Sequence, residues 1–207
     1  WLLAPTAAAA LALVRRERRA AAPFLSIELV GNRGVLAVLL QFAAVNVVFY
    51  AAFFGVPQWL DEVRGLTPGE AGLILLPVTG LGLLTTPLCA RLLARGMRPA
   101  VPLLVGSAGL AAGMAALLGV REATPFALLL GVAAVLGVPN GLNNLGLQTL
   151  LYVRSPAEHT GAAGGLFQMS RYVGSILATA LLALAFGEVA TTDGLHDVAL
   201  AGLAIGL

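Results

Sequence analysis

Lysine is absent from the 207-residue sequence, and cysteine occurs once, at position 89. A single cysteine excludes an intrachain disulfide framework and a metal site built from several thiolates. Charged residues of any kind are scarce: they make up 11% of the chain, whereas hydrophobic residues make up 59%. A soluble globular domain carries roughly 25% charged residues, so the composition excludes one. The excess of apolar side chains predicts that the solvent of this protein is lipid.

Motifs for catalysis and metal binding are also missing. The chain has no G-x-x-x-x-G-K-[ST] phosphate loop, no H-E-x-x-H pair and no paired Cys/His ligands. Its two histidines, His159 and His196, stand alone in predicted loops, where solvation is a better interpretation than metal binding. No Asp or Glu lies in the middle of a complete apolar segment. We therefore expect no enzyme activity, no metal and no cofactor.

Five apolar segments are long enough to cross a bilayer, which takes roughly 20 helical residues. We predict these spans at 34–59, 69–90, 100–120, 125–153 and 163–189. Two shorter apolar pieces, 1–14 and 198–207, lie at the ends of the sequence and are expected to be truncated spans. The sequence thus predicts an all-α integral membrane protein with five complete transmembrane helices and two truncated ones.

The arginines are distributed unevenly between the predicted loops. Nine of the twelve lie in the segments 15–33, 91–99 and 154–162, and only Arg64 and Arg121 lie in the other inter-span segments. Cytoplasmic loops of membrane proteins carry such an excess. We therefore predict a multi-pass protein whose 15–33, 91–99 and 154–162 loops are cytoplasmic. The net charge of +2 is too small, and too scattered, to predict nucleic-acid binding.

Polar side chains at membrane depth are costly and usually face the protein interior or a water-filled path. The 125–153 span has such a face at helical spacing, with Asn143 beside it: Gly137, Asn140, Gly141, Asn144 and Gln148. The 163–189 span and the residues before it carry a second: Gly161, Gly164, Gln168, Arg171, Tyr172, Ser175 and Thr179. The 34–59 span has an aromatic face, with Gln41 adjacent: Phe42, Asn46, Phe49, Tyr50, Phe53 and Pro57. Together these faces predict an amphipathic cavity.

Each of these polar groups also has a purely structural interpretation. Hydrogen bonding between helices is the interpretation we favour for Asn143 and Gln148. For Asn140 and Asn46, which lie nearest mid-span, we slightly favour a role in the cavity over hydrogen bonding between helices. Arg171 lies about 12 Å along its helix from the cytoplasmic end. Three interpretations of its side chain compete: it extends to the membrane interface by snorkelling, it binds a partner in the bundle such as Gln148, or it binds an anionic group in the cavity.

Two further patterns predict helix ends and helix contacts rather than function. Thr67-Pro68-Gly69-Glu70 offers a capping hydroxyl, a proline at the first helical position and a carboxylate three residues after the cap. We therefore assign Glu70 to a capping box and not to proton transport. Gly106, Gly109 and Gly113 form a small-residue surface of the kind on which membrane helices pack.

Three segments share their pattern with one known group of proteins. The first runs from Pro57 to Pro77 and matches the form P-x-x-x-Q-x-V-x-G-x-S/T-P-x-x-A-G-x-x-x-x-P approximately, through Val63, Gly65 and Thr67-Pro68. The others are residues 23–33 and 161–175. In this combination they resemble the C-terminal half of a major facilitator superfamily transporter. The resemblance is to the fourteen-helix EmrB/QacA-type drug:proton antiporters.

This resemblance implies a C-terminal helical bundle of the major facilitator type. It makes 1–14 the eighth of fourteen helices, 15–33 a cytoplasmic Arg-rich loop, and 34–207 the bundle, with its last helix truncated. It implies that the spans 34–59, 69–90, 125–153 and 163–189 line a central cavity and that 100–120 lies outside it. The implied partners are membrane lipid, a small-molecule substrate and the missing N-terminal half of the same transporter.

We accordingly expect a secondary transporter of a bacterial-type inner membrane that exports small hydrophobic or cationic compounds in exchange for protons, by alternating access. The expected substrate-cavity residues are Gln41, Asn46, Tyr50, Phe53, Asn140, Asn144, Gln168 and Arg171. The 91–99 loop resembles the superfamily's basic gating loop, with Leu93 in place of its Asp. The expected gating-loop residues are Arg91, Arg95 and Arg98.

Two alternatives remain open on the same fold. One is a transporter of an anionic metabolite that uses Arg171. The other is a membrane scaffold or receptor that does not transport. An integral-membrane enzyme is disfavoured, because no constellation of carboxylate, His or Cys side chains occurs at membrane depth.

Overall fold

The computed structural model describes Arg15, Leu29 and residues 31–206. The segment 1–14 and most of the 15–33 loop lie outside the described residues. Within the described part the regular elements are helices, with no strand among them. In chain order they are α3 (Arg33–Glu62), α4 (Pro68–Ala94), α5 (Ala100–Leu117), α6 (Phe126–Arg154), the 3-10 helix η1 (Ala157–His159), α7 (Thr160–Phe186) and α8 (Thr192–Gly206).

Five helical segments are long and apolar enough to cross a membrane: α3, α4, α5, α6 and Ala157–Phe186, which joins η1 to α7. Their most apolar windows have mean hydropathies between 1.5 and 2.2. The five predicted spans are therefore confirmed as helices, with boundaries displaced by only a few residues. The capping box is confirmed as well, since the Thr67 backbone N–H donates to Glu70 Oε2 at 2.9 Å.

The predicted start of the last helix is wrong. The sequence predicts position 198, but α8 begins at Thr192. Its start is capped by Thr191, whose Oγ1 accepts from the Gly194 N–H at 3.0 Å. The polar residues around Asp193 predicted a loop, but in a first turn such residues satisfy backbone N–H groups that have no partner within the helix.

The prediction that both histidines are solvated loop residues is consequently wrong for His196. This residue lies on α8 and is half-buried, and its Nε2 is 2.9 Å from the carbonyl oxygen of Val120. His159 ends the short helix η1. No cluster of three or more His, Cys, Asp or Glu side chains suited to a metal ion occurs among the described residues.

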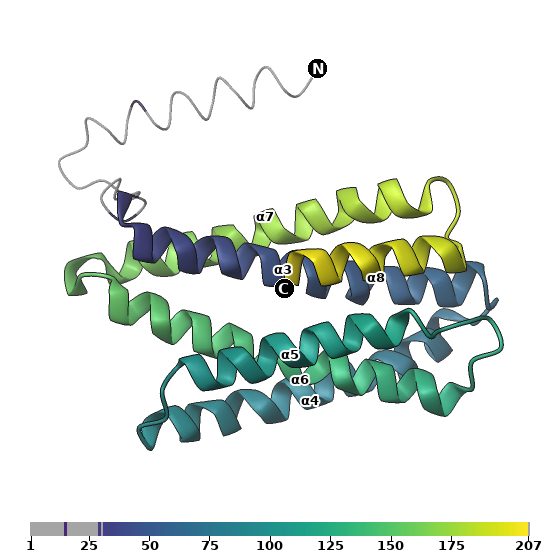
Figure 1. Cartoon of the computed structure of the whole chain (residues 1–207), viewed down its shortest axis with the longest axis horizontal. Helices are drawn as coiled ribbons and strands as arrows, with labels where there is room; N and C mark the ends of the chain where they lie inside the picture. The colour runs from purple at the N-terminus through teal and green to yellow at the C-terminus, as the bar shows by residue number, and fades with distance from the viewer. Residues whose placement is uncertain (1–14, 16–28, 30, 207) are drawn as a thin grey trace.

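The described helices α3 to α8 form two layers (Figure 1). In one layer α3 packs against α7 and α8, and in the other α6 packs against α4 and α5. The layers meet where α3 contacts α6 and where α5 contacts α8. Helices α6, α7 and α8 thus correspond to α3, α4 and α5. The second helix of each set packs on the first helix of the other set: α4 packs on α6, and α7 packs on α3. Internal repeats of this kind are common in secondary transporters.

Glycines set the closest approaches within each layer. A Cβ on Gly137 of α6 would lie 2.7 Å from the carbonyl oxygens of Pro77 and Val78 in α4. A Cβ on Gly174 of α7 would lie 2.7 Å from the carbonyl oxygen of Ala43 in α3. Only glycine permits backbones to approach so closely, and small residues have this role at helix contacts in lipid.

The predicted small-residue surface of α5 is confirmed as a packing surface. Gly106, Gly109 and Gly113 lie against α6, where a Cβ on each would meet Asn143, Pro139 and Leu136 respectively. α5 therefore packs on α6 through a different side from the one that α4 occupies.

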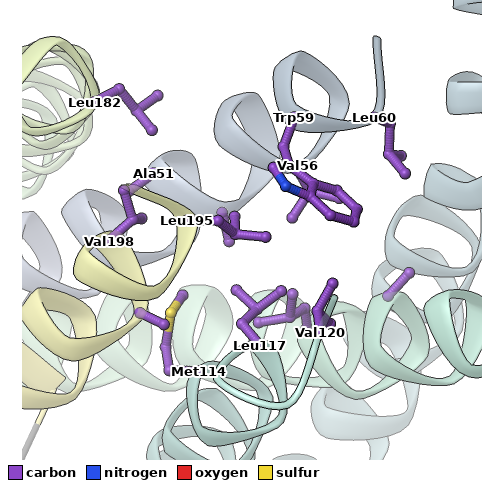
Figure 2. Close-up of a cluster of buried hydrophobic side chains, with 14 of the residues drawn as sticks. Ala51, Val56, Trp59, Leu60, Met114, Leu117, Val120, Leu182, Leu195 and Val198 are labelled. Atoms are coloured by element: carbon purple, nitrogen blue, oxygen red, sulfur yellow. The ribbon is translucent and has the colours of Figure 1, made fainter. Parts of the chain in front are cut away.

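The larger apolar core lies between α3, α5, α6 and α8. Figure 2 shows Trp59 of α3 near Leu195 of α8 and Leu117 of α5. None of these three side chains is more than 1% exposed. Trp59 also donates its indole N–H to Thr192 Oγ1 at 3.2 Å. Because lipid tails are as apolar as leucine, close packing and such hydrogen bonds hold the helices together, rather than exclusion of water.

The turns collect at two opposite ends of the bundle (Figure 1). The start of α3, the α4–α5 turn and the α6–α7 turn share one end, which carries Arg33, Arg91, Arg95, Arg98 and Arg154; we call it the arginine-rich end. The opposite end carries Asp61, Glu62, Glu122, Glu188 and Asp193, with Arg64 and Arg121; we call it the acidic end. The structure therefore places the predicted cytoplasmic loops that it describes at the same end.

Candidate functional site

A groove of about 390 Å³ lies between α4 and α6 near the middle of both helices. We call it the amide groove. Its lining residues are Thr79, Gly82, Leu83, Thr86, Asn140, Asn144, Leu145 and Gln148. The lining contains amides, hydroxyls and leucines but no charged side chain, and the volume lies within the range of small-molecule sites.

The α6 wall of the amide groove is a row of three amides. Asn140, Asn144 and Gln148 follow one another at four-residue intervals, so they lie on one strip of the helix about 12 Å long. All three are half-buried, and none makes a side-chain hydrogen bond to another described residue. Each amide thus retains an acceptor oxygen and a donor NH₂ group for a molecule in the groove.

The α4 wall offers hydroxyl oxygens whose protons are already engaged. Thr79 Oγ1 donates to the Leu76 carbonyl at 3.1 Å, and Thr86 Oγ1 donates to the Gly82 carbonyl at 2.8 Å. These bonds leave the oxygen lone pairs free to accept. Gly82 keeps this wall close to α6, since a Cβ there would lie 3.4 Å from Asn140 Nδ2.

Asn46 of α3 lines a second, much smaller space beside the amide groove. This space is lined in part by Phe42, Asn46, Asn140 and Asn144. Its volume is about 10 Å³, which is enough for one water molecule at most. Asn46 is 7% exposed, and its Nδ2 donates to the Phe42 carbonyl at 2.7 Å within the same helix. The structure thus brings Asn46, Asn140 and Asn144 together, but the Asn46 amide is already partly engaged.

The interpretation of Asn143 as a hydrogen-bonding contact between helices is wrong. Asn143 is 1% exposed, and neither its Oδ1 nor its Nδ2 has a hydrogen-bond partner within the described part of the chain. It points at α5, where Gly106 makes room for it, and not into the amide groove. Gln148, for which we favoured the same interpretation, lines the groove instead.

Arg171 of α7 pairs with an aromatic ring rather than with Gln148. Its guanidinium carbon lies 5.8 Å from the centre of the Phe42 ring. That ring in turn stacks on Phe167, with a centroid separation of 3.6 Å and an interplanar angle of 7°. The Nε of Arg171 is buried and has no hydrogen-bond partner among the residues that the structure describes. The contact is a cation–π interaction, which sequence spacing on one helix could not reveal.

The remaining predicted cavity residues lie apart from the amide groove. Tyr50 and Phe53 belong to an aromatic row on α3, in which Phe49 approaches them at centroid separations of 5.4 and 5.6 Å. Phe53 packs against the larger apolar core. Gln41 and Gln168 are exposed on the surfaces of α3 and α7. None of these four residues lines the groove.

Arg91, Arg95 and Arg98 are exposed around the turn between α4 and α5. The turn itself is defined by Gly96, whose φ of 89° is the left-handed conformation that glycine adopts readily. Arginines at this position can meet helix C-termini or anionic lipid headgroups. Their gating role stays a prediction.

Three polar residues of the groove are missing from the predicted cavity residues: Thr79, Thr86 and Gln148. Thr79 and Thr86 are seven positions apart, so they lie two turns apart on one face of α4. That spacing in the sequence indicates a polar face on α4. This signal is weak by itself, because a threonine hydroxyl in a membrane helix often bonds only to its own backbone, as both of these do.

Comparison with known proteins adds an independent line of evidence. The family described as the Major Facilitator Superfamily matches residues 1–179. The uncharacterized MFS-type transporter YwoD of Bacillus subtilis is 33% identical over 182 residues, which are 87% of this chain and 40% of that protein. The tetracenomycin C resistance and export protein of Streptomyces glaucescens is 32% identical over 180 residues, 81% of this chain and 31% of that protein.

A third relative is the multidrug resistance protein Stp of Mycobacterium tuberculosis, which is 30% identical over 179 residues, 86% of this chain and 33% of that protein. The chain therefore spans about a third to two fifths of the length of these relatives. The family match covers well over half of the chain. Together with five apolar spans in a two-layer bundle, it establishes that this chain belongs to the major facilitator superfamily of membrane transporters.

Proposed function

We propose that this chain forms the C-terminal half of a secondary transporter that exports small hydrophobic molecules from the cytoplasm in exchange for protons. The observation that carries the proposal is the amide groove, where unpaired polar side chains lie at mid-span between two apolar helices. Polar groups at membrane depth usually serve a ligand or a water-filled path. A purely structural role would leave them paired with neighbouring helices.

The names of the relatives support export of antibiotics and drugs. One of them is a tetracenomycin C resistance and export protein and another a multidrug resistance protein. The segments at 57–77 and 161–175 support assignment to the fourteen-helix EmrB/QacA-type antiporters within the superfamily. The repeated three-helix arrangement supports alternating access, in which this bundle rocks against a second one around a shared cavity.

The described residues favour uncharged hydrophobic substrates over cations. Arg171 is the charged side chain nearest the middle of a described span, and no carboxylate accompanies it there. A lipophilic cation, and likewise the transported proton, would therefore use carboxylates in other parts of the transporter. The arginine-rich end is assigned to the cytoplasm on its charge, in a bacterial-type inner membrane.

Transport by the full-length protein in everted membrane vesicles tests this proposal. Uptake of a fluorescent hydrophobic compound into the vesicles should begin when a proton gradient forms and stop when a protonophore collapses it. Uptake that persists after collapse would overturn proton exchange. Complete absence of gradient-dependent uptake across a panel of uncharged and cationic compounds would favour the scaffold or receptor.

A second candidate function is transport of an organic anion. The observation that favours it is Arg171, whose buried Nε lacks a partner. Competition experiments separate the two candidates. Inhibition by organic anions and not by neutral or cationic compounds would favour the anion transporter, whereas the reverse would exclude this candidate.

A further inference from the structure

We propose that the row of amides on α6 recognises an uncharged, oxygen-rich edge of the transported molecule, and that it sets substrate preference. The inference rests on the proposed export function and names a substrate class for the same site. The class is elongated, uncharged molecules that carry several hydroxyl, carbonyl or ether oxygens along one edge.

The first argument is the spacing of the amides. Asn140, Asn144 and Gln148 are each separated by one helical turn, or about 6 Å along the axis. A molecule that satisfies all three has polar groups distributed over about 12 Å of its length. A compact molecule, or one with a single polar group, engages only one of them.

The second argument is the pattern of free donors and acceptors. The amides offer both NH₂ donors and carbonyl acceptors, whereas Thr79 and Thr86 on the opposite wall offer acceptors only, because their protons are bound to backbone carbonyls. Hydroxyl groups on the ligand can donate to the α4 wall and can both donate to and accept from the α6 wall. Carbonyl and ether oxygens fit the amide NH₂ groups.

The third argument is the absence of charge from the groove. Its lining contains no ionisable side chain, and Arg171 contacts Phe42 on another helix pair. A charged ligand group would lie here without a counter-charge in a medium of low dielectric constant. Leu83 and Leu145 provide apolar contacts for the rest of the molecule. The groove therefore selects for neutral polarity.

The test compares two probes in everted vesicles that hold the full-length transporter. The oxygen-rich probe is 4-methylumbelliferyl β-glucoside, which is uncharged and flat at one end and carries sugar hydroxyls at the other. The comparison probe is ethidium, a flat cation without oxygen. Uptake of each, and inhibition of each by the other, are measured for the wild type and for Asn144→Leu, Asn144→Ala and Gln148→Leu.

We expect each amide substitution to raise the glucoside concentration for half-maximal transport or inhibition by about tenfold or more, because a site built for hydrogen bonds discriminates strongly when they are lost. Ethidium transport should change less than twofold. Thr149→Val is the matched control on the same helix: its hydroxyl donates to the Leu145 carbonyl within α6, outside the groove, and both probes should behave as in the wild type.

Three outcomes would overturn the inference. Equal loss of transport of both probes, at unchanged abundance and melting temperature, would assign the amides to contacts with another part of the transporter. Unchanged glucoside values in every variant would exclude recognition. Wild-type transport of ethidium without transport of, or inhibition by, the glucoside would reject the substrate class and leave the export function standing.

Discussion

The guanidinium of Arg171 is held over the ring of Phe42, at 5.8 Å from guanidinium carbon to ring centre. Phe42 is 1% exposed and is also stacked on Phe167. Arg171 and Phe167 are four residues apart on α7, so the same face of α7 presents both partners to one ring of α3. A charge deep in a span is thereby fixed between α3 and α7, and this contact is central to two predictions.

Phe42→Leu should destabilise the protein. Leucine retains apolar bulk but removes the aromatic stack, worth about 0.5–1.5 kcal/mol, and the cation–π contact, worth about 0.5–1 kcal/mol. We expect a loss of about 1–2 kcal/mol, measured as a lower melting temperature of the purified protein in detergent. Phe54→Leu is the control, because Phe54 is 43% exposed and pairs only with Tyr50 and Phe53 on its own helix. Equal losses in both variants would show that the α3–α7 contact adds nothing.

Arg171→Ala should reduce transport by about tenfold or more at unchanged abundance in the membrane. The Arg171 Nε has no hydrogen-bond partner among the described residues, and we expect it to donate to a substrate or protein group during transport. A hydrogen bond that involves a charged group contributes about 1.5–3 kcal/mol, and 1.4 kcal/mol corresponds to a factor of ten. Arg171→Lys retains charge but lacks Nε and the planar fork, so it should recover only part of the activity. Full activity of Arg171→Ala would instead favour the interpretation that this side chain only extends toward the membrane interface.

Helical periodicity predicted the spans and the polar face of α6 well, because a span of about 20 apolar residues has few alternatives in a bilayer. It could not predict which neighbour covers each face. Asn143 differs from Asn144 by one position, yet Asn143 lies against α5 and Asn144 lines the amide groove. That difference depends on where α4 and α5 pack around α6, which is a tertiary property.

Individual side-chain interactions were equally inaccessible to sequence reasoning. The cation–π contact of Arg171 needed the position of α3 relative to α7, and the Asn46 hydrogen bond within α3 needed the side-chain conformation. The start of α8 was missed for a local reason. Polar residues that cap a helix and polar residues in a loop have the same composition, and only the hydrogen bonds of Thr191 distinguish them.

Gly137→Ala should force α4 and α6 apart. The new Cβ would lie 2.7 Å from two carbonyl oxygens of α4, and a backbone cannot rotate away as a side chain can. We expect a loss of about 1–3 kcal/mol in unfolding free energy, with lower yield of folded protein. Gly131→Ala on the same helix has nothing within 4 Å and should be neutral, or up to about 1 kcal/mol more stable through helix propensity. Similar melting temperatures for the two variants would contradict this close approach.

Cysteine labelling should reveal the orientation in the membrane. The native Cys89 is buried, and Cys89→Ser removes it as a background. Ala123→Cys at the acidic end and Ala157→Cys at the arginine-rich end are both exposed positions. A membrane-impermeant maleimide should label position 123 in intact cells and position 157 only after permeabilisation, because arginine-rich loops are retained in the cytoplasm. The reverse pattern would invert the proposed topology.

Asn143→Leu should stabilise the conformation seen in the structure. Asn143 is buried with both polar atoms unpaired, and an unsatisfied buried polar group costs about 1–3 kcal/mol. Leucine branches at the same carbon and has the same number of side-chain heavy atoms, so its bulkier methyl groups can take the place of the amide beside Gly106 with a small adjustment and without this cost. The melting temperature should therefore rise, whereas Asn144→Leu in the half-buried amide groove should bring no comparable gain.

The transport rate of Asn143→Leu then decides whether that amide has a role in the transport cycle. A more stable variant that transports normally would make Asn143 an unfavourable but neutral feature of the α5–α6 contact. A more stable variant that transports slowly would mean that the amide finds its hydrogen-bond partners in another conformation, and that its cost here keeps the two conformations close in energy. A lower melting temperature would contradict the expected gain, because the bulk of leucine beside Gly106, or the loss of a stabilising partner of the amide, would then outweigh the relief of the unpaired polar atoms.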